Sequence, residues 1–199
     1  MSTAHASANP SALVSLPLVT LVLGGARSGK SLYAEQMIGQ GGPGLYLATA
    51  EAGDAEMVER IRMHRARRGP GWETLEEPLD LAGAIARSVR PDRPILVDCL
   101  TLWLSNLMGA DRGIDAAIGD LLAVVERPAG AIVLVSNEVG FGIVPATPLG
   151  RIFRDQAGRL NQAVAAVAAR VVLVTAGLPL VLKDAAPPKQ TLSVKEQAS

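Results

Sequence analysis

The sequence has very little cysteine and no excess of charge of either sign. Cys99 is the single cysteine among 199 residues, which excludes an internal disulfide and a metal site built from cysteine alone. It lies within an apolar run, where a free cysteine usually serves as a small buried hydrophobe. The 19 lysines and arginines balance the 19 aspartates and glutamates, so no overall field attracts nucleic acid or an anionic membrane.

Long apolar runs and targeting signals are also missing. No segment reaches the roughly 18 uncharged apolar residues that a membrane span requires. The first residues, MSTAHASANPSA, lack the basic start of a secretory signal, so we expect a cytoplasmic protein. Residues 1–16 are expected to form a flexible extension and residues 184–199 a polar, flexible tail. The remaining stretch, 17–183, has the length of one domain.

Short apolar runs predict buried strands of a parallel sheet, whose two faces are both covered. They are residues 18–23 (LVTLVL), 44–48 (GLYLA), 94–98 (PILVD), 131–136 (AIVLVS) and 170–175 (RVVLVT). A last run, 179–183 (PLVLK), follows after only three residues, which suffice for a hairpin but not for a parallel crossover. The final strand is therefore predicted to be an antiparallel edge.

Helical patterns lie between these strands, at residues 31–39, 54–68, 79–89, 101–108, 114–126 and 149–169. Alternating strands and helices predict an α/β fold with a single doubly wound, mostly parallel sheet. No internal repeat divides the chain.

A glycine-rich loop follows the first predicted strand. The stretch GGARSGKS fits the phosphate-loop pattern G-x-x-x-x-G-K-[ST] and comprises Gly24, Gly25, Ala26, Arg27, Ser28, Gly29, Lys30 and Ser31. The glycines permit close backbone approach, so that N–H groups and a helix N-terminus can hold phosphates. Lys30 is expected to reach the β- and γ-phosphates, and the Ser31 hydroxyl to bind Mg²⁺. The strand before the loop and the helix after it are the context that this motif requires.

An acidic residue ends a second apolar strand. Asp98 closes the run ILVD, which resembles the Walker B arrangement, in which a carboxylate holds the Mg²⁺ shell. The alternative is that Asp98 caps the following helix. With the phosphate loop, this acid predicts a P-loop NTPase of the RecA-like type.

His64 lies in the strongly basic stretch ERIRMHRARRGPGW, within the predicted helix 54–68. Met57, Ile61, His64 and Arg68 share one helix face, and His64 lies toward its exposed end. A neutral imidazole is a nucleophile near neutral pH, and neighbouring arginines would attract polyphosphate. On the residues alone, a structural histidine on a solvated basic helix remains the better interpretation.

Five stretches resemble the bifunctional adenosylcobinamide kinase / adenosylcobinamide-phosphate guanylyltransferase family of cobalamin synthesis. They are LVLGGARSGKS, YLATA, ERIRMHRARRGPGW, ILVDCLTLWLSNL and IVLVSNEVGFGIVPATPLGRIFRDQAGRLNQ. The resemblance implies phosphorylation of adenosylcobinamide by a nucleoside triphosphate. It also implies that GTP then donates GMP to adenosylcobinamide phosphate through a GMP–histidine intermediate, with GTP, ATP and Mg²⁺ as nucleotides and metal. It further implies a homo-oligomer, a trimer.

The resemblance also assigns residues. The catalytic residues would be Lys30, from the phosphate loop, and His64, which is assigned because the basic residue after it and Trp72 both match the family. Ser31 and Asp98 would hold the metal, although family members may carry Glu where Asp98 stands. Further nucleotide contacts would fall on Ala48, Thr49, Ala50, Arg65, Ala66, Arg67, Arg68, Glu76 and Asp98.

Two questions stay open at this point. Asn137 and Glu138 follow a predicted strand at the edge where doubly wound sheets bind ligands, but the residues do not tell which reaction step they serve. The runner-up functions are a P-loop kinase of another small metabolite and a RecA-like ATPase that acts on a macromolecular partner. The neutral charge disfavours a nucleic-acid partner.

Overall fold

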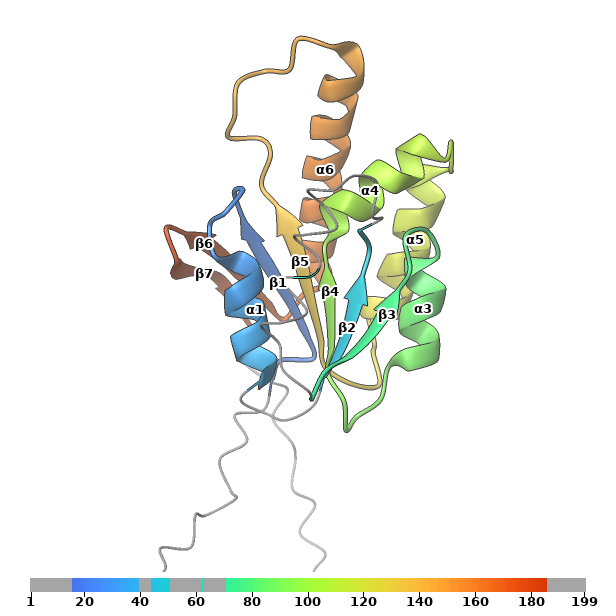
Figure 1. Ribbon diagram of the computed structural model, residues 1–199, viewed down its shortest axis with the longest axis vertical. Coiled ribbons are helices and arrows are strands. Elements are labelled where there is room, and N and C mark those ends of the chain that lie inside the picture. Colours follow the sequence, from blue (N-terminus) through green and yellow to red (C-terminus); the bar gives the residue numbers. More distant parts are fainter. Residues whose placement is uncertain (1–15, 40–43, 51–61, 63–70, 186–199) are drawn as a thin grey trace, which may run out of the picture.

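The computed structural model describes residues 16–39, 44–50, 62 and 71–185 (Figure 1). The strands are β1 (Val19–Gly24), β2 (Leu45–Ala48), β3 (Glu73–Glu76), β4 (Ile95–Asp98), β5 (Ile132–Asn137), β6 (Arg170–Thr175) and β7 (Leu178–Asp184). The helices are α1 (Lys30–Gly39), α3 (Leu81–Ser88), α4 (Leu100–Gly109), α5 (Ile114–Val125) and α6 (Pro148–Val167). All six predicted strands are present, and their bounds shift by at most one residue.

The strands form one sheet in the order β3-β2-β4-β5-β1-β6-β7. Every neighbouring pair is parallel except β6 and β7, which pair antiparallel at one edge. This confirms the predicted mostly parallel sheet and its antiparallel final strand. Strand β5 lies between β1, which carries the glycine loop, and β4, which ends at Asp98.

Helices cover both faces of the sheet, as the doubly wound prediction requires (Figure 1). Helix α1 covers one face, where Ala34 and Ile38 pack on alternate residues of β1, β2, β4, β5 and β6. Helices α3, α4, α5 and α6 pack on the opposite face and form the larger core with the other set of strand residues. Because both faces are buried, the central strands are apolar without alternation.

Strand β3 was not predicted from the sequence. Its residues ETLE are all exposed and carry two carboxylates, so no apolar run marks it. It becomes a strand by pairing in parallel with β2, with Leu45 opposite Glu73 and Ala48 opposite Glu76. The predicted helix 54–68 lies outside the described residues except for Arg62, which is helical.

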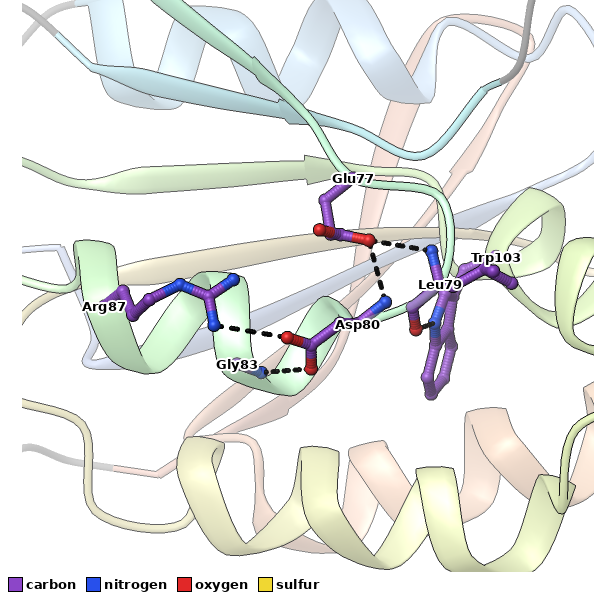
Figure 2. Close-up of polar contacts among 6 residues, drawn as sticks. All are labelled: Glu77, Leu79, Asp80, Gly83, Arg87 and Trp103. Carbon is purple, nitrogen blue, oxygen red and sulfur yellow. Dashed lines mark hydrogen bonds and ion pairs between the residues drawn. The ribbon is translucent and has the colours of Figure 1, made fainter.

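The connection from β3 to α3 is held by carboxylates (Figure 2). The Glu77 carboxylate accepts hydrogen bonds from the backbone N–H groups of Leu79 and Asp80, at 3.1 and 2.8 Å. Asp80 caps α3 by accepting from the Gly83 N–H at 3.1 Å. From the neighbouring helix α4, the Trp103 indole donates to the Leu79 carbonyl at 2.9 Å. These bonds tie the end of β3 to the helices behind the sheet.

A tight turn and an ion pair fix the two ends of the β6–β7 hairpin. Its turn has Ala176 at φ 52° and Gly177 at φ 79°, the left-handed geometry that matches the twist of a tight hairpin. At the open end Arg170 donates two hydrogen bonds to the Asp184 carboxylate, at 3.1 and 2.9 Å. The bond from Arg170 holds the pKa of Asp184 below its usual value. Within the described residues, no helix combines the length and apolarity of a membrane span.

Candidate functional site

The glycine loop connects β1 to α1 at the carboxyl edge of the sheet. Strand β1 ends at Gly24 and helix α1 begins at Lys30. The Lys30 side chain folds back over the loop, and its ammonium donates to the Gly25 carbonyl at 3.1 Å. Although Lys30 is only 8% exposed, Gly25, Ala26 and Arg27 are exposed. An open loop at a helix N-terminus with a lysine folded against it is the arrangement that binds polyphosphates.

Two glycines of this loop are required by its geometry. A Cβ on Gly24 would lie 2.4 Å from the Ser28 hydroxyl oxygen and 2.5 Å from the Val174 carbonyl oxygen. Gly29 has φ +96°, a conformation that side chains rarely adopt, and a Cβ there would lie 3.3 Å from the Cα of Gly177. The motif glycines therefore permit both the tight turn and close contact with β6 and the hairpin turn.

Backbone hydrogen bonds from two neighbouring segments hold the loop. The Gly177 N–H donates to the Ser28 carbonyl at 2.9 Å, which ties the β6–β7 turn to the loop. On the other side, the Glu138 N–H donates to the Gly24 carbonyl at 3.1 Å. These bonds fix the loop against the sheet, which favours precise placement of a bound anion.

Asp98 ends β4 on the same edge of the sheet. It lies opposite Ala48 of β2 and Val135 of β5, while Gly24 lies opposite Asn137 of β5. Its partly exposed carboxylate accepts a hydrogen bond from the Tyr46 hydroxyl at 3.1 Å. The alternative role as a helix cap is wrong, because the N-cap position of α4 is Cys99 and no side chain caps it.

The residue after Asp98 is held by Thr49, which directly follows β2. The Thr49 hydroxyl donates to the Cys99 carbonyl at 2.8 Å and accepts from the Cys99 N–H at 2.9 Å. Thr49 is fully buried, and Asn106 of α4 donates to its carbonyl at 2.7 Å. The Thr49 hydroxyl therefore makes both of its hydrogen bonds within the protein. These bonds hold the backbone beside Asp98. Burial and the nearby Asp98 charge raise the pKa of the Cys99 thiol to about 11.

The other predicted nucleotide contacts lie at differing depths. Ala48 is buried at the end of β2, and Ala50 is partly exposed just beyond it. Glu76 is exposed at the end of β3, opposite Ala48. The register places Glu76, Ala48 and Asp98 in one row across three adjacent strands. The row runs from the edge strand β3 to β4, which is separated from β1 only by β5.

Asn137 is anchored by buried polar groups behind the sheet, whereas Glu138 is held by its backbone bond to Gly24. The Asn137 N–H donates to the Thr101 hydroxyl at 2.7 Å, and its carbonyl accepts from the Asn161 amide at 3.2 Å. Thr101 and Ser136 hydroxyls also lie 3.3 Å apart. Both faces of the Asn137 backbone are thus clamped, so the residue's position between β1 and β4 is well defined.

The remaining candidates belong to the segment 51–70, of which the structure describes only Arg62. His64, Arg65, Ala66, Arg67 and Arg68 lie outside the described residues. In the described part of the chain, no group of three or more His, Cys, Asp or Glu side chains could hold a metal ion. A single carboxylate, Asp98, and the partly exposed Ser31 hydroxyl suit Mg²⁺, which usually takes one or two protein oxygens beside water and phosphate oxygens.

Sequence reasoning did not find Tyr46, Thr101 or Asn106. Tyr46 lies within the apolar run of β2 and resembles a core aromatic, while Thr101 and Asn106 lie in an amphipathic helix. Their partners are 52, 36 and 57 residues away along the chain, so only the folded sheet brings them together. The one signal present was a polar atom on each side chain inside an otherwise apolar stretch.

Comparison with known proteins adds independent findings. A family model described as cobinamide kinase / cobinamide phosphate guanyltransferase matches residues 20–182. The bifunctional adenosylcobalamin biosynthesis protein CobP of Pseudomonas aeruginosa is 49% identical over 166 residues, which cover 82% of this chain and 96% of that protein. The bifunctional adenosylcobalamin biosynthesis protein CobU of Escherichia coli is 41% identical over 181 residues, 83% of this chain and all of that protein.

A solved structure from Pyrococcus horikoshii OT3 shares the fold, with a TM-score of 0.51 at 10% identity. The match covers 85% of this chain and 88% of that chain.

Proposed function

The chain belongs to the cobinamide kinase / cobinamide phosphate guanyltransferase family, and from this premise we propose that it carries out both reactions on adenosylcobinamide. In the first, a nucleoside triphosphate, ATP or GTP, phosphorylates the hydroxyl of the aminopropanol arm. In the second, GTP transfers GMP to the new phosphate and pyrophosphate leaves. The observation that carries the proposal is that a complete phosphate loop and Asp98 share one sheet edge in a chain of this family.

The residues around the loop support the proposed kinase step. Backbone N–H groups of residues 25–31 and the Lys30 ammonium would bind the phosphates and offset the charge that develops as the γ-phosphoryl leaves. Ser31 and Asp98 would hold Mg²⁺, which neutralises phosphate charge when bound. The acceptor hydroxyl attacks the γ-phosphorus and its proton passes to solvent. The bond from that phosphorus to the β–γ bridging oxygen breaks, and the nucleoside diphosphate leaves.

The guanylyl transfer is assigned to His64. A neutral imidazole nitrogen attacks the α-phosphorus of GTP, and pyrophosphate leaves with the electrons of the broken bond. A phosphate oxygen of adenosylcobinamide phosphate then attacks the same phosphorus and releases the histidine. Arg65, Arg67 and Arg68 follow His64 in the sequence and are proposed to bind the polyphosphate.

Product analysis tests the function. The purified protein is incubated with adenosylcobinamide, GTP and Mg²⁺, and the corrinoids are measured by mass spectrometry over time. We expect a phosphorylated corrinoid first and a GDP-linked corrinoid second, with pyrophosphate released in step with the latter. Phosphorylation without the second product would reduce the proposal to a kinase. Turnover of the nucleotide without any corrinoid product would refute it.

The covalent step has its own test. Because a histidine–phosphorus bond is labile in acid and stable in base, the protein should retain label from α-labelled GTP in alkali and lose it in acid. γ-Labelled GTP should leave no such label. His64→Ala should lose the adduct and the GDP-linked product, while phosphorylation declines less because Lys30, Ser31 and Asp98 lie on other elements. An α-labelled adduct on the His64→Ala protein would contradict the assignment.

A further inference from the structure

One oxygen of the Asp98 carboxylate is held by the protein itself. Tyr46 lies opposite Leu96 across the β2–β4 pair, two residues before the level of Asp98 and on the same face of the sheet. From there its hydroxyl reaches Asp98 Oδ2 at 3.1 Å. Among the residues that the structure describes, Oδ1 of Asp98 accepts no hydrogen bond, so this oxygen remains available for a ligand.

The Tyr46 ring is itself fixed in place. It is 6% exposed and packs edge to face against Trp72, with ring centroids 6.4 Å apart and an interplanar angle of 77°. Trp72 in turn closes over Gly44, where a Cβ would lie 2.9 Å from the indole and 2.8 Å from Ile38. Burial and the contact with Trp72 restrict the ring, so the hydroxyl is a pre-oriented donor to Asp98.

We infer that Tyr46 is a positioning residue for Asp98, which orients the carboxylate so that its Oδ1 faces the Mg²⁺–nucleotide site. The inference rests on the proposed metal role of Asp98. A carboxylate on a short side chain can rotate, and a fixed hydrogen bond to one oxygen restricts this rotation and sets the direction of the other. Thr49, which directly follows β2, complements it by holding the backbone of the next residue, so β2 and the residue after it determine both the position and the orientation of the acid.

The alternative is that Tyr46 is a core aromatic whose hydroxyl uses Asp98 only to satisfy its own hydrogen bond. Both readings place the hydroxyl beside Asp98, but they differ in what removing it does. A structural tyrosine affects folding stability and leaves metal binding intact. A positioning tyrosine affects metal binding and turnover through Asp98.

Tyr46→Phe removes the hydroxyl and keeps the ring that contacts Trp72. The affinity for Mn²⁺ is measured by electron paramagnetic resonance in the presence of a non-hydrolysable GTP analogue, and kcat is measured for corrinoid phosphorylation. We expect both to fall about tenfold, the lower end of the loss seen when an outer partner of a metal ligand is removed. The KM for adenosylcobinamide should change by less than about twofold, because no corrinoid contact is altered.

The matched control is Tyr33→Phe, which removes the other tyrosine hydroxyl of the chain from helix α1. Its Mn²⁺ affinity and kcat should equal those of the parent. Combining Tyr46→Phe with Asp98→Ala should add less than about twofold to the loss caused by Asp98→Ala alone, because no carboxylate remains to orient. Thermal unfolding of each variant verifies that it is folded.

The outcomes separate this inference from the proposed function. Parent-like Mn²⁺ affinity and kcat in a folded Tyr46→Phe protein would overturn the inference alone. The inference alone would also be overturned if Tyr46→Phe reduced the Mn²⁺ affinity by the same factor in the parent and in the Asp98→Ala protein. If Asp98→Ala alone left the Mn²⁺ affinity at the parent value, both the inference and the proposed metal site would be overturned. A failure of corrinoid turnover with intact, Tyr46-dependent Mn²⁺ binding would count only against the proposed substrate.

Discussion

Lys30 is the residue whose environment most directly indicates phosphate chemistry. A lysine that is 8% exposed is costly to bury, and here its ammonium lies against the Gly25 carbonyl inside the loop. Under the proposed function, the phosphates of a bound nucleotide would lie beside this ammonium. The residue is thus held near the loop before any ligand arrives, which reduces the reorganisation needed on binding.

Lys30→Ala removes the cation that would face the transferring phosphoryl group. We expect the rate of corrinoid phosphorylation to fall at least about a hundredfold, since stabilisation of several kcal/mol is lost in the transition state. Lys183→Ala is the control, because that lysine lies in β7 and donates to the Ala165 and Ala166 carbonyls of α6. Near-parent phosphorylation by a folded Lys30→Ala protein would rule out the proposed role.

Asp98→Asn separates the charge of this residue from its structural contact. Asparagine retains an oxygen that can accept from Tyr46, so the stability should change by less than about 1 kcal/mol. The loss of charge should lower the phosphorylation rate by about tenfold or more. It should also raise the Mg²⁺ concentration needed for the half-maximal rate. Asp155→Asn, an exposed acid of α6, is the control and should have no effect. An unchanged rate and Mg²⁺ dependence would reduce Asp98 to a structural acceptor for Tyr46.

At the scale of elements, the β6–β7 hairpin serves the loop as well as the sheet. Its turn contains Ala176 at φ 52°, a left-handed conformation that costs a residue with a Cβ roughly 1 kcal/mol. The next residue, Gly177, donates its N–H to the Ser28 carbonyl. The strained turn therefore lies directly against the proposed phosphate site.

Ala176→Gly should relieve this strain and raise the free energy of unfolding by about 0.5 to 1 kcal/mol, measured by urea denaturation. The same substitution at Ala123, an exposed helical position of α5, should lower it by about 1 kcal/mol. Opposite signs for one chemical change would establish that backbone conformation is the cause. A destabilised Ala176→Gly protein would show that the turn adopts another conformation in solution.

At the scale of the whole molecule, most of the large apolar side chains exposed on the described surface gather in two places, apart from Leu18, Leu32 and Leu75. The first is the segment between β5 and α6 and the start of that helix, with Phe141, Ile143, Val144, Leu149 and Ile152 exposed. Figure 1 shows this segment extending beyond the carboxyl edge of the sheet. The second is the edge strand β7, with Leu178, Leu180, Val181 and Leu182 exposed. Exposed apolar groups of this number favour burial against a partner.

We expect the protein to be a homo-oligomer in solution, and a trimer by resemblance to its family. Sedimentation equilibrium should then give about three times the 20.7 kDa mass of the chain, independent of loading concentration in the micromolar range. Dilution into the nanomolar range serves as the control for weak association. A mass equal to one chain at every concentration would contradict the expectation.

Features that depend on neighbours in sequence were predicted from the sequence alone. The glycine loop was recognisable because its turn, its lysine and its helix start are consecutive residues, 24–31. The antiparallel final strand followed from the short link after β6, because chain length forbids a parallel crossover there. The central strands were found because burial on both faces imposes continuous apolar runs.

The tertiary structure decided what depends on residues far apart in the chain. Strand order places β5 between the loop and Asp98, and no local pattern encodes which strands become neighbours. β3 was missed because its exposed ETLE residues become a strand only by pairing with β2. The Tyr46–Asp98 bond likewise joins residues on two strands whose register is set by the sheet. Sequence determines local chemistry through backbone sterics and burial, whereas the orientation of Asp98 depends on contacts that exist only after the strands pair.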